Sequence, residues 1–165
     1  MTSPDDAGCW MELVRPSVLS PRLVLRTNFG LEQDFQLTYR ARHTEALPAV
    51  GGGPRLRTDG GRLIQQGDLR GDVKRALLTP SGVSWAGTPL LTFEVEKSSA
   101  VDHWSVRIGH VPSGEAGVIR CDAACGINLH TRCRLAWPTV PAAPTVVLAA
   151  LMYWWTRLEN DRISD

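Results

Sequence analysis

Short runs in which apolar and polar residues alternate recur along the first three quarters of the chain. The clearest runs are 22–27, 34–40, 91–96, 103–108 and 117–120. In one of them Phe35, Leu37 and Tyr39 share a face, and polar side chains occupy the other. A period of two is typical of a strand with one buried and one solvated face. The pattern therefore predicts an antiparallel β-sheet in which the first two runs form a hairpin.

Glycine and proline separate these runs. Residues 1–20 contain Pro4 and Pro16, are followed by Pro21 and show no sustained period, which predicts an irregular lead-in. Residues 47–61 are rich in glycine and predict a loop, and residues 62–66 predict a short strand. Residues 68–78 carry a weak helical stripe, but a strand at 73–78 fits equally well, so both interpretations stay open at this point.

The end of the chain has a different character. No charged residue occurs from Leu135 to Trp155, and every residue from Val146 to Trp155 is apolar. Because proline is well tolerated in a first helical turn, Pro144 favours a helix over about 145–159. A helix that is apolar on every side must be surrounded by protein or by lipid.

A bilayer-spanning helix needs about 20 apolar residues. The uninterrupted run is half that length, and extending it back to Leu135 includes three prolines, which disrupt helices. The pattern thus favours a helix wrapped by β-sheet. A tail anchor formed by 135–155, with a cytosolic β-domain before it, is the alternative interpretation.

These elements predict a mainly β (α+β) fold, an antiparallel barrel or sandwich with one apolar C-terminal helix packed in or against it. The length of 165 residues fits one domain, taken as 21–165 after the lead-in. A hydrophobic content of 43% and a charged content of 21% are ordinary globular values, which argues against a disordered chain.

Charge and cysteine usage narrow the location and the partners. The net charge of +1 lacks the basic surplus of a dedicated nucleic-acid binder. The first residues are acidic and precede no apolar segment, unlike a signal peptide. Three of the four cysteines fall within thirteen positions, unlike a secreted disulfide scaffold. We therefore expect a cytoplasmic protein, with membrane association as an added expectation of the lipid-binding interpretation below.

Three stretches carry a family resemblance. Leu90–Glu96 leading into His103–Val106 resembles the strand–turn–strand units of the LURP-one-related proteins. Gly126–Leu129 resembles the segment before the last helix of phospholipid scramblases, and Val146–Trp155 resembles that helix. Both groups belong to the tubby-like superfamily, whose barrel closes around such a helix. The resemblance implies a non-enzymatic domain that binds membrane phospholipid or a protein partner.

Clustered arginines offer candidate contacts for a lipid phosphate. They are Arg55, Arg57, Arg62, Arg70 and Arg75. The planar guanidinium fork suits phosphate oxygens, although Asp59, Asp68 and Asp72 lie among these arginines and dilute their charge. A solvated loop is therefore the alternative interpretation of this segment.

A cysteine–histidine cluster is the other candidate site. Its members are Cys121, Cys125, His130 and Cys133. Thiolate and imidazole ligands bind zinc tetrahedrally, so the cluster raises the hypothesis of a small zinc-binding interaction module. The C-x4-H-x2-C spacing resembles half of the diacylglycerol-binding zinc domains of protein kinase C. The alternative is that the cysteines pack as small apolar groups.

Catalytic signatures are missing from the sequence. The patterns H-E-x-x-H, G-x-S-x-G and G-x-G-x-x-G do not occur. Asp102, His103 and Ser105 include the residue types of a hydrolytic triad, but neighbours in a strand point to opposite faces. We therefore predict no catalytic residues.

Overall fold

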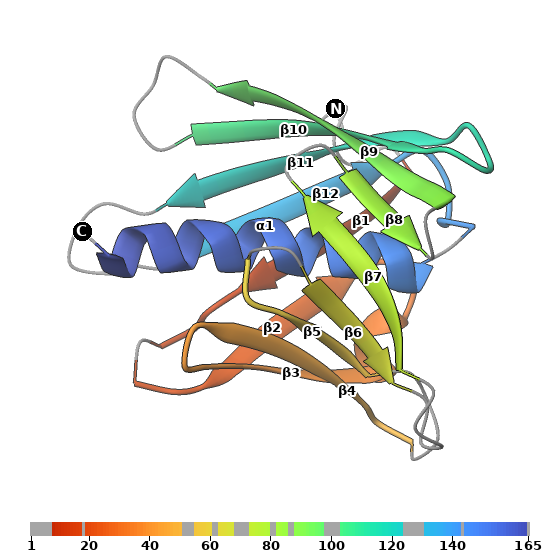
Figure 1. Ribbon diagram of the computed structural model, residues 1–165. Coiled ribbons are helices and arrows are strands. Elements are labelled where there is room, and N and C mark those ends of the chain that lie inside the picture. The colour runs from red at the N-terminus through yellow and green to blue at the C-terminus, as the bar shows by residue number, and fades with distance from the viewer. Residues whose placement is uncertain are drawn as a thin grey trace.

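The computed structural model shows a β-sheet curled around one helix (Figure 1). It describes residues 8–17, 19–50, 55–60, 63–67, 73–79, 82–85, 88–97, 103–123, 131–142 and 144–164. The strands are β1 (Cys9–Val14), β2 (Arg22–Thr27), β3 (Phe35–Arg40), β4 (His43–Pro48), β5 (Leu56–Thr58), β6 (Leu63–Gly67), β7 (Val73–Thr79), β8 (Gly82–Trp85), β9 (Thr88–Lys97), β10 (His103–His110), β11 (Ala116–Ala123) and β12 (Thr131–Trp137). The helices are the short 3₁₀ helix η2 (Leu31–Gln33) and the α-helix α1 (Pro144–Ser164).

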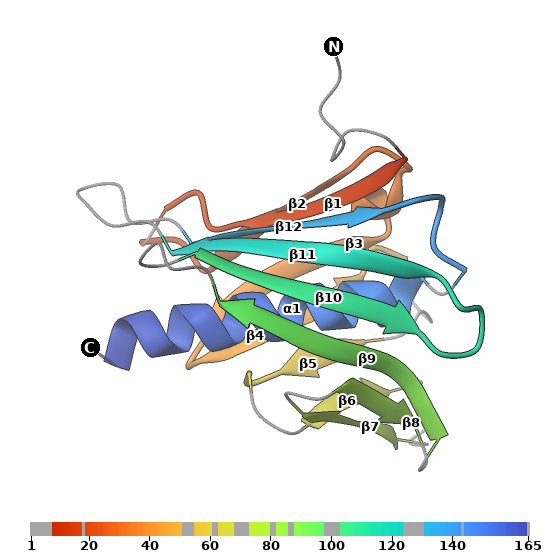
Figure 2. The ribbon, with the colours of Figure 1, turned by 90° about the horizontal axis from the view of Figure 1, so that it is seen from above.

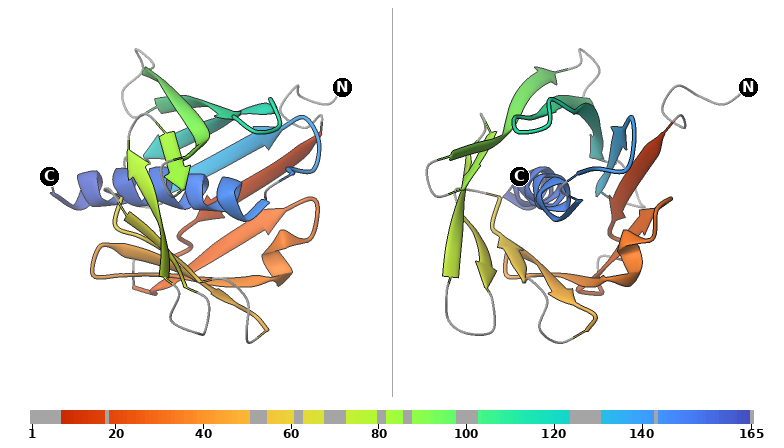
Figure 3. Two further views of the ribbon diagram at one scale, coloured as in Figure 1. Left: turned by 45° about the vertical axis from the view of Figure 1, so that its right-hand side comes forward. Right: turned by 90° about the vertical axis from the view of Figure 1, so that its right-hand side faces the viewer.

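The strands form one antiparallel sheet in the order β5-β4-β3-β2-β1-β12-β11-β10-β9-β8-β7-β6. Neighbours are consecutive in the chain except for β1 and β12, which pair along the full length of β1. The two edge strands, β5 and β6, lie next to each other, although the described ladders do not join them. Seen along the helix axis, strands lie on all sides of α1 (Figure 3).

The helix is buried because it carries apolar side chains on every face. Every side chain from Val147 to Thr156 is buried, and Figure 2 shows β9 and β10 crossing over part of the helix. The predicted fold class, mainly β with one apolar C-terminal helix packed in the sheet, is therefore confirmed.

No helix among the described residues combines the length and the apolar character needed to cross a membrane.

The inward faces of the strands supply the surroundings of the helix. In β12 the side chains of Cys133, Leu135 and Trp137 are buried, with more exposed residues between them. Aromatic rings also pack between the helix and the sheet: Tyr39 of β3 meets Trp155 of α1 edge-on at a centroid separation of 5.2 Å. Such pairs add about 1 kcal/mol to the free energy gained by burial.

Three predicted boundaries need correction. Residues 9–14 of the predicted lead-in form β1, and residues 56–58 of the predicted loop form β5. β5 has only three residues, and five of the six residues of β1 are apolar, so neither strand shows a clear period of two in the sequence. Residues 73–79 form a strand, which makes the helical interpretation of 68–78 wrong where the structure describes it.

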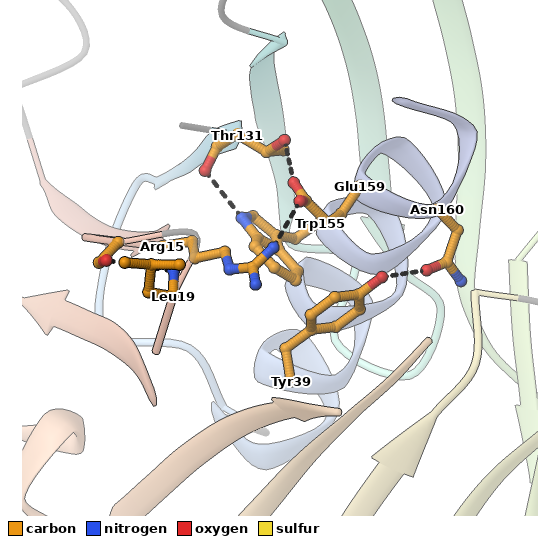
Figure 4. Close-up of polar contacts among 8 residues, drawn as sticks. Arg15, Leu19, Tyr39, Thr131, Trp155, Glu159 and Asn160 are labelled. Atoms are coloured by element: carbon orange, nitrogen blue, oxygen red, sulfur yellow. Dashed lines mark hydrogen bonds and ion pairs between the residues drawn. The ribbon is translucent and has the colours of Figure 1, made fainter. Parts of the chain in front are cut away.

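The C-terminal half of α1 is joined to the sheet by polar contacts (Figure 4). Glu159 is fully buried, and its carboxylate accepts hydrogen bonds from the Arg15 guanidinium at 3.0 Å and from the Thr131 hydroxyl. The Thr131 carbonyl accepts a hydrogen bond from the indole N–H of Trp155 at 2.9 Å. Since a buried charge is costly unless it is paired, these contacts hold the helix in one axial position.

Asn160 makes a second set of contacts on the next helical position. Its amide oxygen accepts a hydrogen bond from the Tyr39 hydroxyl at 2.5 Å. Its amide nitrogen donates to the carbonyls of Arg42 at 3.1 Å and Asp59 at 2.9 Å. One side chain thus joins the helix to the β3–β4 turn and to the residues that follow β5.

Gly60 lies where the chain after β5 comes close to the backbone of α1. Its φ is +77°, and an added Cβ would lie 2.9 Å from the backbone nitrogen of Arg157. Gly114 has a similar φ of +74° with nothing within 4 Å, so it provides a matched control. We expect Gly114→Ala to cost about 1 kcal/mol through backbone strain alone. Gly60→Ala should cost about 3 kcal/mol because overpacking adds to that strain.

Urea unfolding of both variants measures these free energies. Equal losses for Gly60→Ala and Gly114→Ala would contradict the contact with the helix backbone.

Candidate functional site

The structure brings two members of the cysteine–histidine cluster together. Cys121 in β11 and Cys133 in β12 lie directly opposite each other, and both are buried on the face that meets the helix. Cys125 and His130 lie outside the described residues. Within the described part of the chain, no three histidine, cysteine or acidic residues gather closely enough to hold a metal ion. Zinc binding by the complete cluster stays a prediction.

The predicted phosphate-binding arginines are described only in part. Arg55 and Arg57 flank the inward-facing Leu56 and are both exposed. Arg55 forms an ion pair with Glu45 at 2.9 Å, and Arg57 lies opposite the same glutamate in the β4–β5 ladder. A single carboxylate therefore offsets part of the charge of both guanidinium groups.

The side chains of the other three arginines of that prediction lie outside the described part of the structure. Arg75 lies in β7 opposite Gln65, and its side chain lies outside the described atoms. Arg62 and Arg70 lie outside the described residues altogether. Their contribution to a phosphate site stays a prediction.

A second group of arginines lies on the outer face of β2, β12 and β11. The strand registers align Arg26 with Glu12, Glu12 with Arg134, and Arg134 with Arg120. Arg132 lies two positions before Arg134 on the same face of β12. We call Arg26, Arg120, Arg132 and Arg134 the arginine row. Sequence reasoning missed the row because it depends on β12 and on the pairing of β1 with β12.

The arginine row concentrates positive charge on a rigid surface. Like charges directly opposite each other in a ladder are destabilising, yet Arg134 faces Arg120 across β12 and β11. The guanidinium of Arg134 lies over the ring of Trp10, 4.7 Å from its centroid, and this cation–π contact fixes its position. Along the same strand registers, the four positive charges of the row are accompanied by two acidic residues, Glu12 and Asp122. The surface therefore favours a ligand with several negative charges.

A histidine, a serine and a glutamate meet in the turn between β10 and β11. The His110 ring nitrogen Nδ1 lies 2.6 Å from the Ser113 hydroxyl, which donates to Glu115 at 3.1 Å. The serine lies between the other two groups, whereas in hydrolases the imidazole lies between the serine and the carboxylate. These hydrogen bonds link residues within the turn, and their order differs from that of a catalytic triad.

Glu115 also connects this turn to the segment that leads into α1. Its carboxylate accepts hydrogen bonds from the Ala142 backbone N–H at 3.1 Å and the Thr139 hydroxyl at 3.2 Å. The backbone hydrogen bond from Ala142 is the main reason that the pKa of Glu115 lies below its ordinary value. The entry of the helix into the sheet is thus held by an ionised carboxylate.

No protein-family model, curated protein or solved structure matches this chain. The resemblance to the tubby-like superfamily therefore stays a prediction.

The contacts of Glu115 predict that the stability of the folded protein depends on pH. Because its pKa is lowered in the folded protein, the carboxylate stabilises the fold above the unfolded-state pKa of about 4.3, and this stabilisation is lost as the pH falls through the folded-state pKa. Glu115→Gln should thus be less stable than the parent protein at neutral pH. The difference should shrink in acid, once the parent carboxyl is protonated.

Urea unfolding of both proteins at neutral and at acidic pH measures this difference. Thr139→Val is the control, because it removes one donor and leaves the titrating carboxyl in place. A Glu115→Gln defect of the same size at both pH values would contradict the role of the charge.

Proposed function

We propose that this protein is a non-enzymatic binding domain that attaches to the phosphate groups of membrane phospholipids through the arginine row. The observation that carries the proposal is the alignment of Arg134 with Arg120 across β12 and β11, beside the exposed Arg132. Guanidinium groups bind phosphate oxygens through paired hydrogen bonds, and several close together suit a headgroup with more than one anionic oxygen.

The architecture supports a surface function. The interior of the curled sheet is filled by α1, whose side chains from Val147 to Thr156 are buried. The outward-facing residues of the strands are therefore the part of the sheet that is accessible to a partner. A sheet whose strands are paired on both sides holds these residues at fixed spacing, which reduces the entropy lost on binding.

The resemblance of the sequence to the tubby-like superfamily also supports a phospholipid ligand. A helix running inside a curled antiparallel sheet is the layout that resemblance to the tubby-like superfamily predicts. That resemblance also implies phospholipid as a ligand. A protein partner with an acidic surface is the alternative ligand.

Vesicle co-sedimentation tests the proposal. The test variant is Arg26→Gln/Arg120→Gln/Arg132→Gln, which removes three exposed charges of the arginine row and keeps the stacked Arg134. The comparison variant, used as the control, is Arg40→Gln/Arg55→Gln/Arg57→Gln, which removes the same number of exposed charges and includes two arginines of the competing phosphate site predicted from the sequence. Each protein is mixed with phosphatidylcholine vesicles, with or without phosphatidylserine or a phosphoinositide.

We expect the parent protein to bind the anionic vesicles and to be released by salt, because screening shortens the range of the attraction. An arginine near an anionic membrane contributes about 1 kcal/mol, so the test variant should lose roughly a hundredfold in partitioning. The control should lose much less. Equal losses in the two variants, or no binding by the parent protein to anionic vesicles, would refute the proposal.

A further inference from the structure

The strands β2 and β3 separate along half of their length. Each has six residues, yet their ladder contains only two pairs, Arg22 with Thr38 and Leu23 with Leu37. By comparison β3 and β4 pair over six positions. The connection between β2 and β3 includes η2, which lies beside the end of β2 where the strands part.

A cleft of about 300 Å³ occupies the gap. Its lining includes Arg22, Leu23, Leu25, Glu32, Phe35 and Gln36. The buried side chains among the lining residues are all apolar, and the polar ones are exposed or half-buried. Apolar walls with a few polar groups at the mouth are typical of ligand sites, and the volume is at the lower end of their range.

The backbone of Leu25 is directed into this cleft. In an antiparallel ladder every second residue bonds to one neighbouring strand, and the residues between bond to the other. The Tyr39 N–H donates to the Pro21 carbonyl at 2.7 Å, so Leu23 and Leu25 are the next β2 residues whose backbone groups face β3. Leu23 is paired, whereas the described ladder ends before Leu25 could pair with Phe35.

The pairing of β2 with β1 independently shows that the backbone groups of Leu25 face β3. The Asn28 N–H donates to the Trp10 carbonyl, so residues 26 and 24 bond to β1 while residue 25 does not. An amide N–H and a carbonyl of a strand thus face an apolar cleft, and an extended peptide is the ligand that satisfies both.

The charges at the rim give such a peptide a direction. Arg22 lies at the end of the cleft where the strands are still paired. Glu32, which accepts a hydrogen bond from the Thr27 hydroxyl, lies at the end where they have parted. A peptide with its terminal carboxylate at Arg22 matches both charges, and the reverse orientation would place that carboxylate beside Glu32.

We propose that the cleft between β2 and β3 binds the carboxyl end of an extended peptide whose last side chain is apolar. The peptide adds a short strand that pairs with Leu25, its apolar side chain enters the cleft, and Arg22 binds the terminal carboxylate. This site is separate from the arginine row, so it stands whether or not the protein binds phospholipid.

Fluorescence polarisation tests this proposal with three labelled pentapeptides, Gly-Thr-Val-Thr followed by Leu, Val or Phe, each with a free carboxyl end or a carboxamide. Arg22→Gln removes the proposed carboxylate contact, and Arg40→Gln removes an exposed arginine from β3 outside the cleft. Gln36→Trp fills the rim of the cleft, and Arg40→Trp places the same side chain on β3 outside it.

At least one free-carboxyl peptide should bind the parent protein, and the carboxamide should bind about fivefold more weakly, as expected for a partly exposed ion pair. Arg22→Gln should show a similar loss and no further effect of the carboxamide, because both changes remove the same contact. Gln36→Trp should abolish binding, whereas the two control variants should bind like the parent protein.

Three results would overturn the proposal. The first is that none of the three peptides binds the parent protein. The second is that the carboxamide weakens binding to Arg22→Gln as much as to the parent protein. The third is that Gln36→Trp and Arg40→Trp bind alike.

Discussion

The burial of α1 is the constraint on which the rest of the structure depends. Ten consecutive apolar side chains leave the helix without a face that favours water, so the fold must cover it on all sides. Strands whose side chains the structure describes, such as β3 and β12, turn an apolar face to the interior, and the curled sheet surrounds the helix. Because the helix fills the interior, the two ligand sites proposed among the described residues lie on the outer face of the sheet and in a gap between its strands. The arginine row and the cleft between β2 and β3 are examples of these two kinds of site.

Apolar packing alone would not fix where the helix lies along its axis. The polar contacts near its two ends fix that position. The pairing of Glu159 with Arg15, and the three hydrogen bonds of Asn160, join the C-terminal half of the helix to β1, β3 and the residues after β5. At the other end Glu115 holds the segment that precedes the helix. Buried polar contacts of this kind add specificity of position more than net stability.

Much of the fold could be predicted from the sequence, because one-sided strands and an all-apolar helix leave clear periodic patterns. The strands β3, β9 and β10 follow such patterns over six residues or more. The strand β5 was missed because it has three residues, β1 because five of its six residues are apolar, and β12 because it lies beside segments rich in proline and cysteine. The sites were less accessible to sequence reasoning. Proximity along the chain pointed to Arg55 and Arg57, whereas the arginine row depends on a register between strands more than a hundred residues apart.

Native-state hydrogen exchange of the helix amides tests the enclosure of α1 most directly. Local openings of an exposed helix release its amides quickly, whereas a helix enclosed by a sheet exchanges only when the whole fold opens. The account predicts that the amides from Leu148 to Trp155 are among the slowest in the protein, with an opening free energy equal to that of global unfolding measured with urea. Exchange of this segment at a much lower free energy than global unfolding would contradict the account.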